Sequence, residues 1–210
     1  MDWQRYLELI QADADRMATV GLRDLSRPVP PCPGWDVAQV VRHTGSVYLH
    51  KVAWLRLGSK PAPDDWQREP PAGEELVSWF RAAHQGLIAE LQQRDPGSHA
   101  STWWPPNQTA GFWYRRMALE TVVHRVDVES GLGDLSPVDA ELAEDGIDEV
   151  LQIMLADPDL EADRQGPHGS VAVETQTRWI MPPSSRSSLP RAAFLISQRQ
   201  RSTAVASSPT

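Results

Sequence analysis

The sequence has very little cysteine and no long apolar run, and each shortage excludes a class of protein. Cys32 is the single cysteine among 210 residues, so the chain forms no internal disulfide and no cysteine-based zinc site. Any metal must therefore be bound by nitrogen and oxygen atoms. No segment approaches the roughly 18 apolar residues of a membrane helix, and the N-terminus lacks a signal pattern. We therefore expect a cytoplasmic protein with no membrane partner.

Acidic residues are missing from the end of the chain. All 28 acidic residues lie at or before Glu174, with 15 of the 20 basic residues, so this body has a formal charge of −13. The last 36 residues carry +5. The net charge of −8 argues against nucleic acid as a partner. Residues 180–210, rich in Ser, Arg and Pro, are predicted to be a disordered tail. The alternative is that a frameshift has replaced the true C-terminal module.

Apolar residues recur at helical spacing in five segments, which predicts an all-α protein. We expect helices over residues 3–20, 36–57, 74–93 and 109–130, and from Ser136 to just before Pro158. Asp36 and Gln39 match a capping box, and Gly58 is the expected end of the second helix. The proline-rich residues 59–72 are expected to form a loop. The predicted architecture is a four-helix bundle plus one extra helix.

The fourth predicted helix carries the most informative side chains. Glu120 and His124 are four residues apart, so they lie on one helix face within reach of one ion. Trp113 and Met117 share that face, which therefore points toward the bundle interior. An acid and an imidazole placed there cost several kcal/mol unless they are paired or bound to a metal.

A third candidate ligand, His43, lies on the second predicted helix. A histidine from one helix and a Glu/His pair from a facing helix supply three of the four positions of a catalytic zinc site, leaving one for water or substrate. The spacing alone is also compatible with a surface ion pair or a satisfied core histidine.

Two segments resemble one known family. The stretch Pro31-Cys-Pro-Gly-Trp-Asp-Val-Ala-Gln-Val-Val-Arg-His43 resembles the opening motif of the mycothiol-dependent maleylpyruvate isomerase family, and Glu120-Thr-Val-Val-His124-Arg-Val-Asp127 is similar to its E-x-x-x-H-x-x-D helix. The resemblance covers residues 1 to about 155. It implies a DinB-like bundle in which His43, Glu120 and His124 bind a divalent metal, usually zinc. It also implies that the thiol of mycothiol, an actinobacterial cofactor, reaches the open metal position.

The resemblance also implies a reaction. A metal-bound thiol loses its proton near neutral pH, and the thiolate is the nucleophile. In the isomerase it would add to the cis double bond of maleylpyruvate, allow rotation and leave. In sister transferases it would attack a small electrophile and remain attached. Family members carry a second, α/β domain, so we divide this chain into a bundle over residues 1–157, a remnant of that domain over 158–179, containing a strand-like segment, and the tail 180–210.

Four further residues are candidates for the site. Asp127 is expected to orient a metal ligand, with a surface ion pair to Arg125 as the alternative. Arg125 is a candidate contact for an anionic substrate, with a solvated arginine as the alternative. Trp35 and Trp104 are candidates to wall the cofactor cleft. Cys32 is instead expected to be a packing residue.

Three functions stay open at this point. The first is a metal-dependent, mycothiol-using isomerase or S-transferase, working as a monomer or homodimer. The second is a metal-assisted hydrolase, although Asp127 is its only clear candidate base. The third is a metal-stabilised bundle that binds a ligand without turnover.

Overall fold

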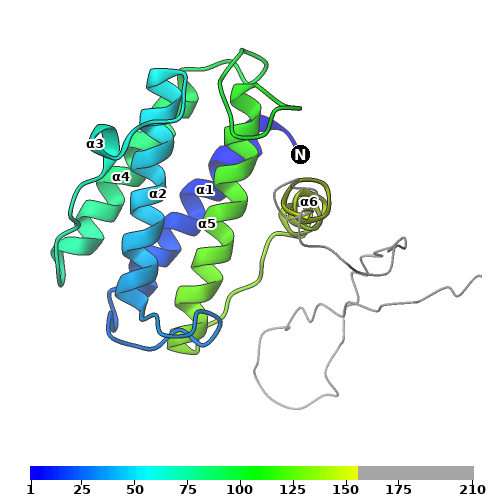
Figure 1. The fold of residues 1–210 in the computed structure, drawn as a ribbon. Coiled ribbons are helices and arrows are strands. Elements are labelled where there is room, and N and C mark those ends of the chain that lie inside the picture. Colours follow the sequence, from blue (N-terminus) through cyan, green and yellow to red (C-terminus); the bar gives the residue numbers. More distant parts are fainter. Residues whose placement is uncertain (156–210) are drawn as a thin grey trace, which may run out of the picture. The chain divides into compact units, whose positions relative to one another are not determined.

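A computed structural model describes residues 1–155 of the chain. The expected strand-like segment, the tail and most of the predicted remnant lie outside these residues. The chain divides into two compact units, Met1–Leu142 and Ala143–Thr210. The first unit contains four long helices, α1 (Trp3–Gly21), α2 (Val37–Leu57), α4 (Glu75–Gln92) and α5 (Ala110–Leu132), as Figure 1 shows. The predicted all-α bundle is confirmed, while the predicted domain boundaries stay a prediction.

The four helices pack in a ring in which α5 lies between α1 and α2, and α4 closes the ring on the other side. Helices α1 and α5 run in the same direction, because Trp3 stacks on Tyr114 near their N-termini and Arg16 bonds Glu129 near their C-termini. None of the helices within residues 1–155 combines the length and apolar character needed to cross a membrane.

The contact between α2 and α5 positions the site, and here the two helices are antiparallel. The Tyr48 hydroxyl lies 2.7 Å from the Thr121 hydroxyl, and both residues are fully buried. Two turns further on, the rings of Trp54 and Trp113 are 5.4 Å apart. This buried hydroxyl pair disfavours other registers, because sliding either helix by one turn would leave the buried Tyr48 hydroxyl without its Thr121 partner.

The ends of α2 are those that its sequence predicts. The Asp36 carboxylate accepts a hydrogen bond from the Gln39 backbone N–H at 2.8 Å, and the Gln39 side chain accepts one from the Asp36 N–H. Gly58 ends the helix in the left-handed region at a φ of 67°, which costs glycine little.

The structure corrects three predicted boundaries. The loop over residues 59–72 contains one short helical turn, α3 (Pro63–Trp66), with Pro63 at its first position. Helix α5 ends at Leu132, two residues past the expected 130, with Gly133 as its left-handed C-cap. The last α-helix within residues 1–155, α6 (Ala140–Glu149), begins four residues after Ser136, because the Asp139 carboxylate caps it by accepting from the Leu142 N–H. A π-helical segment, Val150–Met154, follows α6.

Two helical glycines give a matched test of the packing. A Cβ at Gly45 on α2 would overlap the Trp79 indole of α4, whereas a Cβ at Gly86 on α4 would meet no atom within 4 Å. We predict that Gly45→Ala lowers the free energy of unfolding by about 1–3 kcal/mol through overpacking. Gly86→Ala should raise it by about 0.5–1 kcal/mol, because alanine favours the helix. Urea denaturation measures both, and equal effects would show that α2 and α4 do not pack in this way.

Candidate metal centre

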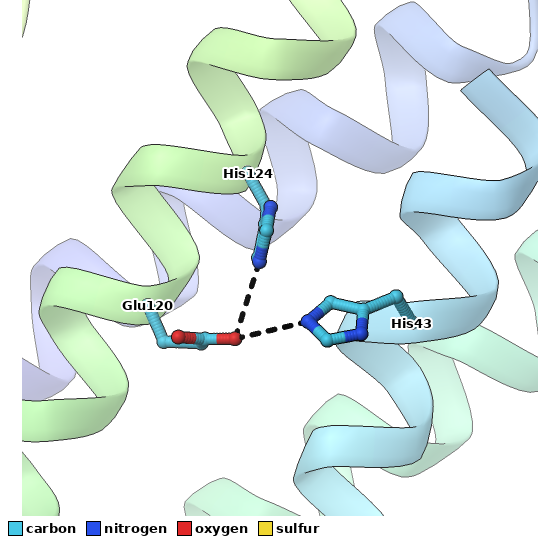
Figure 2. Close-up of side chains that lie close together, drawn as sticks. All are labelled: His43, Glu120 and His124. Atoms are coloured by element: carbon cyan, nitrogen blue, oxygen red, sulfur yellow. Dashed lines mark hydrogen bonds and ion pairs between the residues drawn. The ribbon is translucent and has the colours of Figure 1, made fainter. Parts of the chain in front are cut away.

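Three side chains from α2 and α5 converge on one point. Figure 2 shows the His43 and His124 rings pointing toward the Glu120 carboxylate. Glu120 Oε1 lies 3.4 Å from His43 Nε2 and 3.2 Å from His124 Nε2. One ligand atom from each of the three residues lies within 4.8 Å of the other two. The structure therefore brings together the three residues that the sequence predicts to be metal ligands.

Local structure explains this convergence. Glu120 and His124 are one turn apart on α5, so their side chains leave the same face of that helix. His43 lies in the second turn of α2, and the antiparallel register places it opposite the C-terminal half of α5. The rings of His43 and His124 have centroids 4.8 Å apart and are nearly perpendicular.

The donor set fits a divalent metal such as zinc. Tetrahedral zinc is bound at about 2.0–2.2 Å by imidazole nitrogen and carboxylate oxygen, which places neighbouring ligand atoms about 3.4 Å apart. The two Nε2–Oε1 separations, 3.2 and 3.4 Å, match that spacing. Three protein ligands leave a fourth position for another group, as in catalytic zinc sites.

Each residue of the Glu/His pair has an outer partner. His124 Nδ1 lies 2.9 Å from the Asp127 carboxylate, so the Nδ1–H group donates a hydrogen bond to Asp127 and Nε2 points toward the cluster. Arg116 donates to Glu120 Oε2 at 2.6 Å, which leaves Oε1 facing the two imidazoles. Asp127 thus contacts the candidate ligand His124 and forms no surface ion pair with Arg125 in the described chain, and its role in orienting a metal ligand stays a prediction.

These partners set the protonation of the metal-free cluster. Burial alone would raise the pKa of Glu120, but hydrogen bonds from both histidines and the charge of Arg116 hold that pKa well below its ordinary value. Burial alone would lower the pKa of His124, but hydrogen bonds to Asp127 and Glu120 outweigh burial and raise it to about 9. At neutral pH a metal must therefore displace a proton from His124.

The segment before α2 positions a wall of the site. Pro33 and Gly34 form the central residues of a β-turn in which the Trp35 N–H donates to the Cys32 carbonyl at 2.9 Å. Gly34 has a φ of 84°. A type II turn with proline at its second residue requires a positive φ at its third, which glycine adopts readily. The turn places the Trp35 ring 5.3 Å from the His43 ring, so Trp35 does flank the cluster.

Sequence reasoning missed the surroundings of Cys32. Burial, the charge of Asp127 and a hydrogen bond to that carboxylate together raise the pKa of the Cys32 thiol. Cys32 is therefore a neutral, partly buried neighbour of Asp127, next to the residue that bonds His124. Only the fold could reveal this contact, since 95 residues separate Cys32 from Asp127 in the sequence.

Trp104 and Arg125 do not join the cluster. Trp104 precedes α5, and the start of that helix lies about 15 Å along the axis from Glu120. The Trp104 ring packs edge-on against the Trp103 ring. A contact of Trp104 with a cofactor stays a prediction. Arg125 is only 2% exposed and pairs with Asp13 and Glu129 on the side of α5 that faces α1. This burial corrects the interpretation of Arg125 as a solvated arginine, and its contact with a substrate stays a prediction.

An all-α bundle with a His-Glu-His cluster between two antiparallel helices defines a DinB-like protein with a candidate metal centre. The family described as mycothiol maleylpyruvate isomerase N-terminal domain matches residues 6–129, more than half of the chain. The chain belongs to this family, as the resemblance of its two motifs predicts. Comparisons with curated proteins and with solved structures find no match.

The protonation of His124 is directly testable in metal-free protein. Because its folded pKa is raised to about 9, its contribution to stability is present below the ordinary value of about 6.5 and is lost as the pH rises through about 9. NMR titration should show a midpoint near 9 for the imidazole signal that disappears in His124→Ala. Asp127→Asn should lower that midpoint, and a midpoint near 6.5 in both proteins would contradict the described contacts.

Proposed function

We propose that the chain binds one divalent metal, with zinc as the expected ion, through His43, Glu120 and His124. We propose further that it uses mycothiol as a thiol cofactor to act on a small electrophile, as an isomerase or an S-transferase. The observation that carries the metal assignment is the placement of Glu120 Oε1 at 3.2 and 3.4 Å from two imidazole nitrogens. Membership of the mycothiol maleylpyruvate isomerase N-terminal domain family supports the choice of thiol.

The protein's own residues prepare this chemistry. Asp127 holds the Nδ1 proton of His124, so the Nε2 lone pair is the one offered to the metal. Arg116 occupies Glu120 Oε2, which favours binding through Oε1 alone and keeps a position open. Trp35 contacts one side of the His43 ring, and the His43 side chain stays 39% exposed, which leaves an approach for a ligand. A bound divalent metal would lower the pKa of a thiol at that open position, making the thiolate available near neutral pH.

The metal assignment predicts how zinc binding responds to mutation. His124→Ala removes one of the three proposed protein ligands. Losing a residue that only hydrogen-bonds a ligand usually lowers metal affinity by about tenfold to a hundredfold, so we expect zinc affinity to fall by more than about a hundredfold here. The variant should stay folded, because the apolar faces of α1, α2, α4 and α5 are unchanged. His99→Ala, which alters an exposed loop histidine, is the matched control. Competition against a zinc-binding dye gives the affinities, and equal affinities for both variants would reject the assignment.

The thiol assignment needs a separate test. Zinc-loaded protein should bind mycothiol with one-to-one stoichiometry in a calorimetric titration. S-methyl mycothiol keeps the sugar groups but cannot form a thiolate. Because it loses the charged interaction with the metal, we expect it to bind at least about tenfold more weakly than mycothiol. The thiol complex should then be assayed with maleylpyruvate and with alkylating electrophiles.

The outcomes of this experiment separate the candidate functions. Fumarylpyruvate formed from maleylpyruvate would identify an isomerase, and a stable thioether would identify a transferase. Zinc binding with equal affinity for mycothiol and its S-methyl derivative would reject the thiolate reaction. That result would direct attention to metal-assisted hydrolysis or to ligand binding without turnover.

A further inference from the structure

Lys51 is a half-buried cation on α2, two turns beyond His43. Its ammonium group lies 2.8 Å from His50 Nδ1 and 5.4 and 5.3 Å from the ring centroids of Trp54 and Trp113. Both indoles are buried, so they form an apolar floor beneath the charge. Burial and the charge of Lys51 lower the pKa of His50 to about 4, so His50 is neutral and accepts the hydrogen bond.

This cation lacks a counter-charge in direct contact. Within residues 1–155 its polar contact is the neutral imidazole of His50, and no carboxylate lies within ion-pair distance of its Nζ. An ammonium group has three donors, so two remain after the bond to His50. Burial lowers the pKa of Lys51 to about 8, which indicates that its charge is poorly compensated. Cation–π contacts offset only part of such a desolvation cost.

Lys51 also lies beside the candidate metal centre. The carboxylate of Glu120 is close enough to raise the pKa of Lys51, and the guanidinium of Arg116 is close enough to lower the pKa of Lys51. Arg116 bonds the outer oxygen of Glu120, so this guanidinium and the Lys51 ammonium are two cationic groups near one carboxylate. Eight residues of helix separate His43 from Lys51, about 12 Å along the axis. A ligand of a few carbon atoms could extend between the open metal position and this ammonium group.

We propose that Lys51, backed by Trp54 and Trp113 and oriented by His50, forms an anion subsite that binds a carboxylate of the substrate. The subsite belongs to the helical bundle itself and needs no residue beyond 155. As a statement about substrate, the proposal rests on the proposed function. As a statement about anion binding, it stands on the contacts of Lys51 alone.

Calorimetric titration of the metal-free protein with malonate tests the subsite. Removing the metal eliminates chelation of the ion by the dicarboxylate, and malonamide is the uncharged control ligand. Losing a charge-assisted hydrogen bond should weaken malonate binding about tenfold to a hundredfold in Lys51→Met. Lys51→Arg, which keeps a cation, should retain affinity within about threefold. Lys60→Met removes the other lysine of the chain, an exposed cation close enough to lower the pKa of Lys51, and should change malonate affinity by less than about threefold.

A labelling experiment locates the bound anion. The chain contains only two lysines, Lys51 and Lys60, so acetylation of each can be followed by mass spectrometry without overlap. Saturating malonate should slow acetylation of Lys51 at least about fivefold, and it should leave Lys60 unchanged. Absence of malonate binding, equal affinity of Lys51→Met and Lys60→Met, or unprotected Lys51 would each overturn the subsite.

The two proposals can fail separately. If malonate binds at Lys51 but mycothiol shows no thiolate-dependent binding, the anion subsite stands and the proposed reaction fails. If the thiol reaction proceeds, the parent enzyme should prefer a carboxylate-bearing electrophile over its amide by about tenfold to a hundredfold in kcat/KM. Lys51→Met should abolish that preference, Lys51→Arg should restore it, and a preference unchanged in Lys51→Met would reject Lys51 as the substrate's partner.

Discussion

The buried contact between α2 and α5 is the constraint on which the candidate site depends. The Tyr48–Thr121 hydroxyl pair at 2.7 Å fixes the register of two antiparallel helices. That register alone decides that His43 meets Glu120 and His124, rather than residues one turn away. A change of one turn moves a side chain by about 5.4 Å, more than the 4.8 Å that now spans the three ligand atoms. The geometry of the cluster therefore depends on a packing contact, Tyr48 with Thr121, that is not part of the cluster.

Helix α5 carries buried or half-buried charged side chains on two sides, one toward α2 and one toward α1, and the charges on each side have their own partners. Toward α2, Glu120 is bordered by His43, His124 and Arg116. Toward α1, Arg125 pairs with Asp13 and Glu129, and burial raises the pKa of Asp13 to about 6 despite the nearby arginine. Buried charges need such partners to be tolerated. The proposed metal chemistry involves the first group, and the ion pairs of the second join α5 to α1.

The sequence predicted what depends on local pattern and missed what depends on distant contacts. Asp36, Gln39 and Gly58 define the limits of α2 through capping rules that act within four residues. The three-residue cluster was also predictable, because helical spacing aligns Glu120 with His124 and the family's opening motif adds His43. The burial of Arg125 was not, since helix periodicity does not reveal that Asp13 of α1 lies opposite. The contacts of Cys32 with Asp127 and of Lys51 with Trp113 were missed for the same reason, because each joins two different elements.

The central claim is that two imidazoles and one carboxylate bind a single zinc ion. X-ray absorption spectroscopy of the zinc-loaded protein examines the metal's own environment and needs no crystal. The account predicts nitrogen and oxygen scatterers at about 2.0–2.2 Å, with the multiple-scattering signature of two imidazoles. Addition of mycothiol should introduce one sulfur at about 2.3 Å. A protein that takes up no zinc, or a spectrum without imidazole scattering, would contradict the account.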